Sequence, residues 1–412
     1  MPLTFKNHKL SNGLRVIAEC NDAAHTAAVG FFVKTGARDE DAPLMGVSHF
    51  LEHMMFKGTD RRSADDVNRE FDEIGADYNA YTSHEQTVYY AQVLPEYLPR
   101  AVDLLGDILR PALRTDDFEM EKNVILEEIG MYDDRPQWRL QDTLLELYFP
   151  QHPLGFRVLG TNDTVKQLTA EQMRDYFSHR YSADNIVVSA AGKIDFDALV
   201  KDIEKLTSEW QPSGAQRRYD APPAVDCERS LTDKKLSRHY MALMCPGPNA
   251  QDDRRYAAKV LADVLGDAEG SRIYWALVDP GEADEADLSF IPYDQAGGYM
   301  AYASCDPDKA AQVEAKLLAT IDAFARDGDV ADDEIERAKN KLATQVTLQS
   351  ERPGGRMRDL GTRWQYLQAY ATLEDEIERL MAVSGDDVRQ LLVEFPFSPR
   401  TIVRLGPNGI AD

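Results

Sequence analysis

The sequence is poor in cysteine. Only four of its 412 residues are cysteines (Cys20, Cys227, Cys245 and Cys305), and no two of them form a C-x-x-C pair or another short metal-ligand spacing. This scatter excludes a compact cysteine metal motif and is typical of reduced structural thiols. We therefore expect a reducing compartment, by default the cytoplasm.

Positive charge is also scarce. Lysine and arginine total 46 against 71 aspartates and glutamates, so the formal net charge is -25 and the isoelectric point is near 4.7. This balance argues against nucleic acid or an anionic membrane as a partner, because both repel a negative surface. It favours cavities that attract cationic groups, such as basic peptides, although plain solubility would account for it equally well.

Long hydrophobic runs are missing as well. Nowhere do about eighteen apolar residues follow one another, so no membrane span is expected. The first seven residues, Met1-Pro2-Leu3-Thr4-Phe5-Lys6-Asn7, begin no apolar run of signal-peptide length. A cytoplasmic protein is the expectation, and a periplasmic protein whose leader has been removed is the alternative.

Histidine is rare too, yet two of the eight histidines stand together in His49-Phe50-Leu51-Glu52-His53. Four residues apart on a helix, the two imidazoles lie on one face and can reach a single metal ion. Glu52 points into the same space, where its carboxylate can act as general base on a zinc-bound water. The order H-x-x-E-H is the inverzincin signature, the reverse of the commoner H-E-x-x-H. The surrounding helix is apolar, so these polar groups need partners, and a metal ion would satisfy them together.

A third ligand must come from elsewhere, because catalytic zinc usually has three protein ligands and one position open for water. The best candidate is the predicted helix over 119–132, where Glu121 and Glu128 share one face. Glu128 would then be the ligand and Glu121 a supporting carboxylate for a ligating histidine. Glu127 lies about 100° away around the helix, but periodicity alone does not exclude it as the ligand.

The order of predicted elements recurs along the chain. Strands, the histidine helix, two further strands, a series of helices and a final helix–strand pair fill the first half, and a similar order returns roughly 215 residues later. The pattern predicts an α+β fold with two homologous domains, each an antiparallel-rich sheet backed by helices. We predict a zinc-binding domain at 1–210, a linker at 211–226 and a duplicated domain without zinc at 227–412. The helix over 256–263, the counterpart of the histidine helix, contains no histidine.

These motifs resemble a known family. The pentapeptide, followed 74 intervening residues later by Glu128 in a V-I-L-E-E-I context, resembles the M16 (pitrilysin-type) zinc peptidases. The length, the duplication and Gly270-Ser271-Arg272-Ile273-Tyr274 resemble its M16B branch, which includes processing peptidases. The resemblance implies a fold of the LuxS/MPP-like metallohydrolase type and one zinc ion per chain.

Particular roles follow from this resemblance. It implies that His49, His53 and Glu128 are the zinc ligands, that Glu52 is the general base, and that Glu121 supports a ligand. It also implies that Asn79 and Ala80 lie on an edge strand that pairs with the substrate. An extended peptide added to a sheet edge gains main-chain hydrogen bonds with little sequence preference, which makes this role physically reasonable.

The chain departs from the family at one point. Active members often carry an arginine and a tyrosine seven residues apart, which hold the peptide beside the zinc. In the segment 278–286 those positions read Asp279 and Ala286, while the nearby Arg272 and Tyr274 have the wrong spacing. Either another chain supplies the pair or the substrate is held differently.

The sequence therefore predicts a zinc metalloendopeptidase that hydrolyses peptides or short unfolded segments in an enclosed chamber. The resemblance implies a homodimer, or a heterodimer with a related M16 chain that lacks the zinc motif. The alternative is a non-catalytic M16-like scaffold or peptide-binding subunit of a heteromeric assembly. Such subunits typically lose one or more motif positions, whereas all four are present here.

Overall fold

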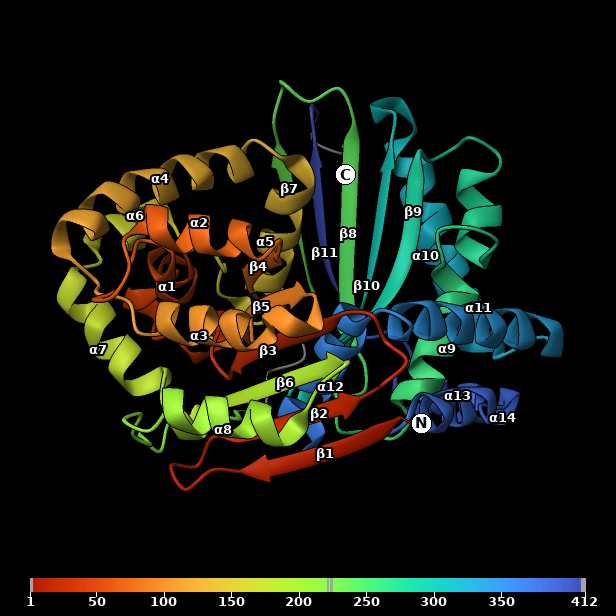
Figure 1. Ribbon diagram of the computed structural model, residues 1–412. Coiled ribbons are helices and arrows are strands. Elements are labelled where there is room, and N and C mark those ends of the chain that lie inside the picture. The colour runs from red at the N-terminus through yellow and green to blue at the C-terminus, as the bar shows by residue number, and fades with distance from the viewer. Residues whose placement is uncertain (1–2, 221, 223–224, 409–412) are drawn as a thin grey trace. The chain divides into compact units, whose positions relative to one another are not determined.

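The structure, a computed structural model, describes residues 3–220, 222 and 225–408. It consists of two compact units, each built from separate stretches of the chain (Figure 1). Unit 1 comprises the described residues within Met1–Gly130, Phe156–Arg218 and Thr347–Tyr370, and unit 2 those within Met131–Gly155, Tyr219–Val346 and Ala371–Asp412. The two units therefore interleave along the sequence, whereas the predicted ranges were consecutive.

The predicted linker, 211–226, has no helix or strand among its described residues, and residues 221, 223 and 224 lie outside the described part. Arg217 in this segment is buried, and its Nη2 lies 2.7 Å from Oδ2 of Asp39. The beginning of the segment is thus held in unit 1. The division into a zinc-binding domain and a domain without zinc stays a prediction.

Unit 1 is built on a mixed sheet whose described strands have the order β1-β2-β6-β3-β5-β4. These strands are β1 (Thr4–Lys9), β2 (Arg15–Cys20), β3 (Ala27–Val33), β4 (Asp77–Thr82), β5 (Thr87–Val93) and β6 (Ile186–Gly192). Only the β2–β6 pair is parallel among these neighbours. Every residue of β3 is buried, so β3 lies at the centre, whereas β4 forms an edge.

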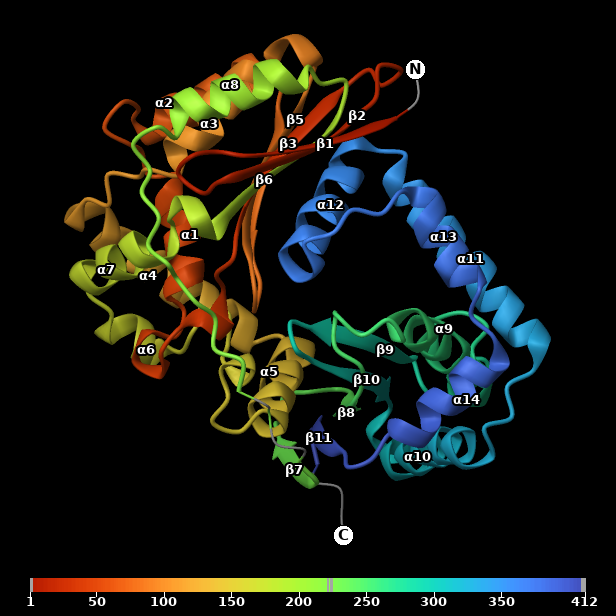
Figure 2. The same cartoon turned by 90° about the horizontal axis from the view of Figure 1, so that it is seen from below.

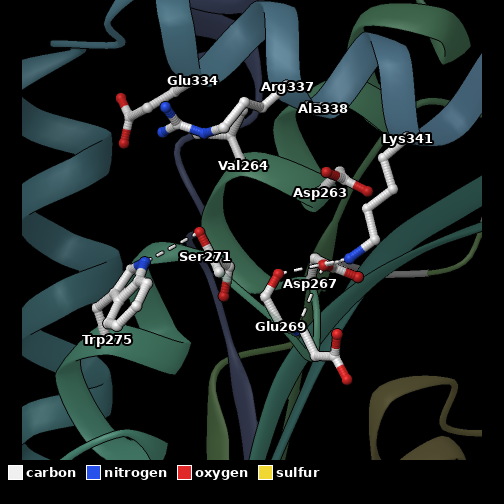
Figure 3. Close-up of a pocket in the computed structure, with 11 residues that line it drawn as sticks. Asp263, Val264, Asp267, Glu269, Ser271, Trp275, Glu334, Arg337, Ala338 and Lys341 are labelled. Atoms are coloured by element: carbon white, nitrogen blue, oxygen red, sulfur yellow. Dashed lines mark hydrogen bonds and ion pairs between the residues drawn. The ribbon is translucent and has the colours of Figure 1, made fainter.

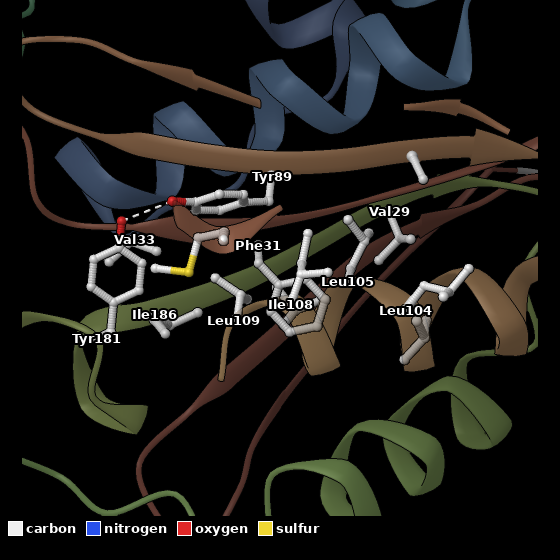
Figure 4. Packing of buried hydrophobic residues seen from close by; sticks show 14 of the residues in the cluster. Val29, Phe31, Val33, Tyr89, Leu104, Leu105, Ile108, Leu109, Tyr181 and Ile186 are labelled. Carbon is white, nitrogen blue, oxygen red and sulfur yellow. Dashed lines mark hydrogen bonds between the residues drawn. The ribbon is translucent and has the colours of Figure 1, made fainter. Parts of the chain in front are cut away.

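Helices cover this sheet on both faces. The helices of unit 1 are α1 (Val47–Met55), α2 (Ala64–Glu73), α3 (Leu98–Ile108), most of α4 (Thr115–Asp133), α6 (Asn162–Gln167), α7 (Ala170–Arg180), α8 (Phe196–Leu206) and α12 (Pro353–Leu367). Figure 4 shows Leu105 and Ile108 of α3 packed beside Phe31 of β3. In the same core the hydroxyls of Tyr89 and Tyr181 form a hydrogen bond of 2.9 Å, which satisfies their polar ends away from water.

The opposite face of the sheet is covered by α12, which comes from far along the chain (Figure 2). Met357 and Leu360 of α12 pack against Phe32 of β3. Arg356 and Glu19 form a buried ion pair of 2.6 Å, with 4% and 5% of their side chains exposed. A cationic helix segment is thus fixed to β2 by a charge pair that is costly to break.

Unit 2 repeats the plan of unit 1. Its strands are β7 (Cys227–Thr232), β8 (His239–Pro246), β9 (Glu285–Tyr293), β10 (Ala296–Cys305) and β11 (Thr401–Gly406). Their order, β7-β11-β8-β10-β9, corresponds to β2-β6-β3-β5-β4, and β7–β11 is parallel as β2–β6 is. The predicted α+β class with two homologous, antiparallel-rich sheets backed by helices is confirmed.

The helices of unit 2 show how the two halves interleave. They are α5 (Pro136–Tyr148), α9 (Arg255–Gly266), α10 (Ala310–Asp327), most of α11 (Asp332–Ser350), α13 (Leu373–Met381) and α14 (Gly385–Glu394). Helix α5 packs on β8 and β11, as α12 packs on β3 and β6. Corresponding helices are therefore exchanged between the repeats. No helix formed by the described residues is long and apolar enough to cross a membrane.

Candidate metal centre

The histidine-bearing helix α1 begins at a fixed point. Its N-cap, Gly46, has φ +96°, and a Cβ there would lie 2.7 Å from the carbonyl oxygen of Leu159, so only glycine fits without strain. The carboxyl of Glu40 accepts hydrogen bonds from the backbone N–H groups of Gly46 and Ser48, both at 2.7 Å. Burial raises the pKa of Glu40 to about 8, against the effect of these two donors. The first turn of α1 is thereby held in place.

Helix α4 lies against α1 through an aromatic pair. The rings of Phe50 and Phe118 stack with centroids 4.7 Å apart and planes at 7°. The buried residues of α4 follow the helical period and are Phe118, Glu121, Ile125 and Ile129. The same face that packs on α1 therefore carries Glu121 into the interior, and Glu128 lies at its edge.

This packing brings the three predicted ligands together. One ligand atom each of His49, His53 and Glu128 lie within 4.8 Å of one another. Oε2 of Glu128 is 3.8 Å from Nε2 of His49 and 3.5 Å from Nε2 of His53. The helix that carries the carboxylates is therefore within reach of an ion shared with the histidine helix.

The separations of 3.5 Å and 3.8 Å from Glu128 to the two imidazoles are close to those around a zinc ion. Tetrahedral zinc holds nitrogen and oxygen ligands at about 2.0–2.2 Å, which places the ligand atoms about 3.3–3.5 Å from one another. Two imidazoles and one carboxylate also form a standard catalytic ligand set, with a fourth position for water. Burial, with the neighbouring His53, lowers the pKa of His49 to about 3, so its ring is neutral and can bind a metal. Nδ1 of His49 is buried without a hydrogen-bond partner among the described residues, and such groups usually have one.

The orientation of His53 is set by Glu121. Oε1 of Glu121 lies 2.9 Å from Nδ1 of His53, which leaves Nε2 facing Glu128. Burial alone would lower the pKa of His53, but the hydrogen bond that its ring donates to Glu121 and the nearby carboxylates outweigh it and raise that pKa. A carboxylate on the far nitrogen of a ligating histidine is a common support in zinc sites.

The structure also separates Glu128 from Glu127, which periodicity left undecided. Glu127 is exposed and belongs to the outer face of α4, together with Met120, Val124 and Met131, which are 65%, 45% and 60% exposed. Glu128 is half-buried and belongs to the cluster with the two histidines. The geometry therefore favours Glu128.

Glu52 is half-buried and bonded to a residue that the sequence did not single out. Its Oε2 accepts a hydrogen bond of 2.6 Å from the hydroxyl of Thr82, at the end of β4. Burial raises the pKa of Glu52, and the Thr82 hydroxyl and His53 oppose this rise. Thr82 escaped prediction because it is thirty residues away in sequence and only the fold brings the two side chains together.

Asn79 and Ala80 lie on β4, which is the edge strand of the unit-1 sheet. Asn79 pairs with Tyr90 and Ala80 with Tyr89 of β5, so the other side of β4 has no neighbouring strand in the described sheet. Oδ1 of Asn79 accepts a hydrogen bond from the backbone N–H of Ala80 at 2.8 Å. The predicted edge position is thus present, while substrate pairing stays a prediction.

The segment 278–286, which lacks the arginine–tyrosine pair, lies in unit 2. Ala286 is buried in β9, and Asp279 follows the π-helical turn Tyr274–Val278. Arg272 forms an ion pair of 2.7 Å with Glu334, so its guanidinium already has a local partner.

A pocket of about 500 Å³ also lies in unit 2 (Figure 3). It contains none of the predicted metal or substrate residues. Lys341 pairs with Asp267 at this pocket, and Trp275 donates a hydrogen bond to the carbonyl oxygen of Gly270.

Comparison with known proteins places the chain in a family. Residues 15–162 match the domain described as insulinase (peptidase family M16), and residues 167–342 match the peptidase M16 inactive domain. The protein named uncharacterized zinc protease YmxG of Bacillus subtilis is 30% identical over 407 residues, covering 98% of this chain and 99% of its own length. The chain belongs to peptidase family M16.

Solved structures share the fold. A protease from Helicobacter pylori has a TM-score of 0.90 at 19% identity, covering 98% of this chain and all of the other. A chain of complex III2 from Candida albicans has a TM-score of 0.84 at 19% identity, covering 98% and 96%. At these identities the likeness extends to the fold alone.

Proposed function

We propose that this protein is a zinc-dependent endopeptidase with its active site in unit 1. The observation that carries the proposal is the convergence of His49, His53 and Glu128 on one point, with Glu52 on the same helix. Membership of family M16 and the zinc-protease names of its relatives support it.

His49, His53 and Glu128 would hold one zinc ion, and Glu121 would keep the ring of His53 in the orientation for binding. When bound, zinc lowers the pKa of a coordinated water to about 7 and polarises the carbonyl of a substrate.

Glu52 would be the general base and then the general acid. Its carboxylate accepts a proton from the attacking water and delivers it to the departing amine of the peptide. A raised pKa brings Glu52 nearer to neutral pH, where a group can both take up and release a proton. The hydrogen bond from Thr82 would hold one carboxylate oxygen while the other remains available.

This hydrogen bond gives a specific prediction. Thr82→Val is expected to lower kcat/KM about tenfold or more, because a hydrogen bond to a charged group contributes roughly 1.5–3 kcal/mol. Thr82→Ser keeps the hydroxyl and is expected to remain near the parent. Zinc affinity should be the same in the parent and in both variants. If Thr82→Val and Thr82→Ser cleave the peptide equally fast, the proposed role of the Thr82 hydroxyl is wrong.

The substrate is proposed to be a peptide or a short unfolded segment. Asn79 and Ala80 on the open edge of β4 would pair with its backbone, and the net charge of -25 suits cationic sequences. The proposal includes an enclosed chamber formed by a homodimer or by a heterodimer with a related chain. The arginine–tyrosine pair would then be supplied by the partner or replaced. All four cysteines are free, which suits the proposed cytoplasmic location.

The proposal is tested with an unstructured cationic peptide and the purified protein. Cleavage is expected, with loss of activity after chelation and recovery when about one equivalent of zinc per chain is returned. A folded protein of similar composition should remain intact. If zinc-loaded protein leaves every peptide of a diverse library uncut, the peptidase assignment is wrong.

The rival function is a non-catalytic scaffold or peptide-binding subunit. The absence of the arginine–tyrosine pair favours it, as does the occurrence of the same fold in a complex III2 chain. The convergence of His49, His53 and Glu128, with Glu52 present on the same helix as the histidines, opposes it. A scaffold would bind peptides without cutting them, both with and without zinc.

A further inference from the structure

A lysine outside the predicted site contacts its supporting carboxylate. Nζ of Lys57 lies 2.5 Å from Oε2 of Glu121, while Oε1 of Glu121 lies 2.9 Å from Nδ1 of His53. The two oxygens of one carboxylate are thus divided between a histidine of the metal cluster and an ammonium group. Lys57 stands four residues after His53, just beyond the end of α1, which lets both side chains reach α4.

The carboxylate has little freedom and little water. Only 5% of the Glu121 side chain is exposed, against 37% of the Lys57 side chain. Without Lys57, Oε2 of Glu121 would lose a charged partner in a nearly buried position, and an unsatisfied buried acceptor is costly. Lys122, the next residue along α4, does not replace it, since its Nζ donates to the carbonyl oxygen of Leu168 at 2.8 Å.

Lys57 also faces an open pocket. It lines a pocket of about 480 Å³ together with Arg61, Arg62, Ser63 and Arg114, among others. The Lys57 side chain is 37% exposed, so its removal would leave a space that small solutes can enter from the pocket. This access makes the role of Lys57 testable by substitution and by chemical replacement.

We propose that Lys57 is a positioning residue of the metal centre, which fixes the carboxylate of Glu121 and through it the ring of His53. The inference rests on the proposed function. The side chain of Lys57 pairs with Glu121, which is not one of the proposed metal ligands. Its effect should therefore be on metal affinity and on the geometry of the site.

The first experiment compares Lys57→Met with Arg61→Met. Both remove one positive charge from the same pocket, but Arg61 is 56% exposed on its side chain and pairs with Asp103 rather than with Glu121. Competition with a chromophoric chelator is expected to show zinc affinity about tenfold weaker in Lys57→Met, the lower end of what loss of an outer partner costs. Arg61→Met and the conservative Lys57→Arg should stay within about twofold of the parent.

The second experiment is chemical rescue. Lys57→Ala is titrated with propylammonium chloride, which can place an ammonium group in the pocket beside Glu121. Zinc affinity should recover toward the parent value, whereas sodium chloride at the same ionic strength should have no effect. A general loss of folding would not respond to one particular cation, and circular dichroism of the variants identifies such a loss.

The possible results separate a failure of the positioning role of Lys57 from a failure of the proposed function. If Lys57→Met binds zinc as tightly as the parent, or if it weakens only as much as Arg61→Met, the positioning role is wrong. A Lys57→Ala protein that propylammonium does not rescue also contradicts it. If the parent itself binds no zinc in this assay, the proposed function fails instead.

Discussion

Replacing Glu52 with glutamine is expected to abolish peptide cleavage while the protein keeps its zinc. Glutamine has nearly the same shape as glutamate but cannot accept the proton of the attacking water, and loss of a general base typically costs roughly 10²–10⁴-fold in rate. Glu52 is not one of the three residues whose ligand atoms converge. Its substitution should therefore affect kcat far more than metal content.

The measurement combines metal analysis of the dialysed variant with single-turnover cleavage of an unstructured peptide. Glu127→Gln is the matched control, because it removes one carboxylate from an exposed position near the site. Should Glu52→Gln retain zinc and cleave as fast as the parent, the catalytic role of Glu52 is wrong. Cleavage lost together with the metal would show that Glu52 binds zinc rather than serving as the base.

Glu128→Gln is expected to have the largest effect on zinc affinity of any single carboxylate substitution. It removes the charged oxygen that lies 3.5 Å and 3.8 Å from the two imidazoles. Loss of an outer partner costs roughly 10–100-fold in affinity, and loss of a ligand should exceed that range. Glu121→Gln, which affects only the support of His53, should fall within the range.

Glu127→Gln is again the control, since the two glutamates are neighbours in sequence and lie on different faces of α4. Calorimetric titration with zinc is expected to give the order Glu128→Gln, then Glu121→Gln, with Glu127→Gln near the parent. Equal zinc retention in Glu127→Gln and Glu128→Gln would refute the choice of ligand. Thermal unfolding without metal should differ little between Glu127→Gln and Glu128→Gln.

Much of the fold was predictable because its signals are local. The histidine-bearing helix and the predicted helix over 119–132 correspond to α1 and α4. Their apolar periodicity determines the element type within a few residues. The duplication was also visible, because the same order of elements recurs.

Other elements carried no such signal. The edge strands β1 and β7 are mostly exposed, so they lack the alternation of buried residues that reveals a strand. Helix α12 contains several glycines, which lower helix propensity. Its helical form depends on packing against β3 and β6. The exchange of α5 and α12 between the two sequence repeats is likewise a tertiary property that no local pattern encodes.

The residues of the candidate site likewise include some that the sequence reveals and others that only the fold brings together. His49, Glu52 and His53 were identified from spacing on one helix, and Glu128 from a second helix and a family resemblance. Thr82 could not be found in this way, since its contact with Glu52 depends on where β4 ends. Lys57 carried a weak signal, its spacing of four from His53, but only the structure shows that Glu121 lies between them.

The proposed mechanism requires one zinc ion held jointly by the two histidines and the distant glutamate. Anomalous diffraction at the zinc absorption edge, from crystals of the zinc-loaded protein, would locate this ion. We expect one strong peak per chain within bonding distance of His49, His53 and Glu128. A peak elsewhere, or none near these three residues at full zinc loading, would contradict it.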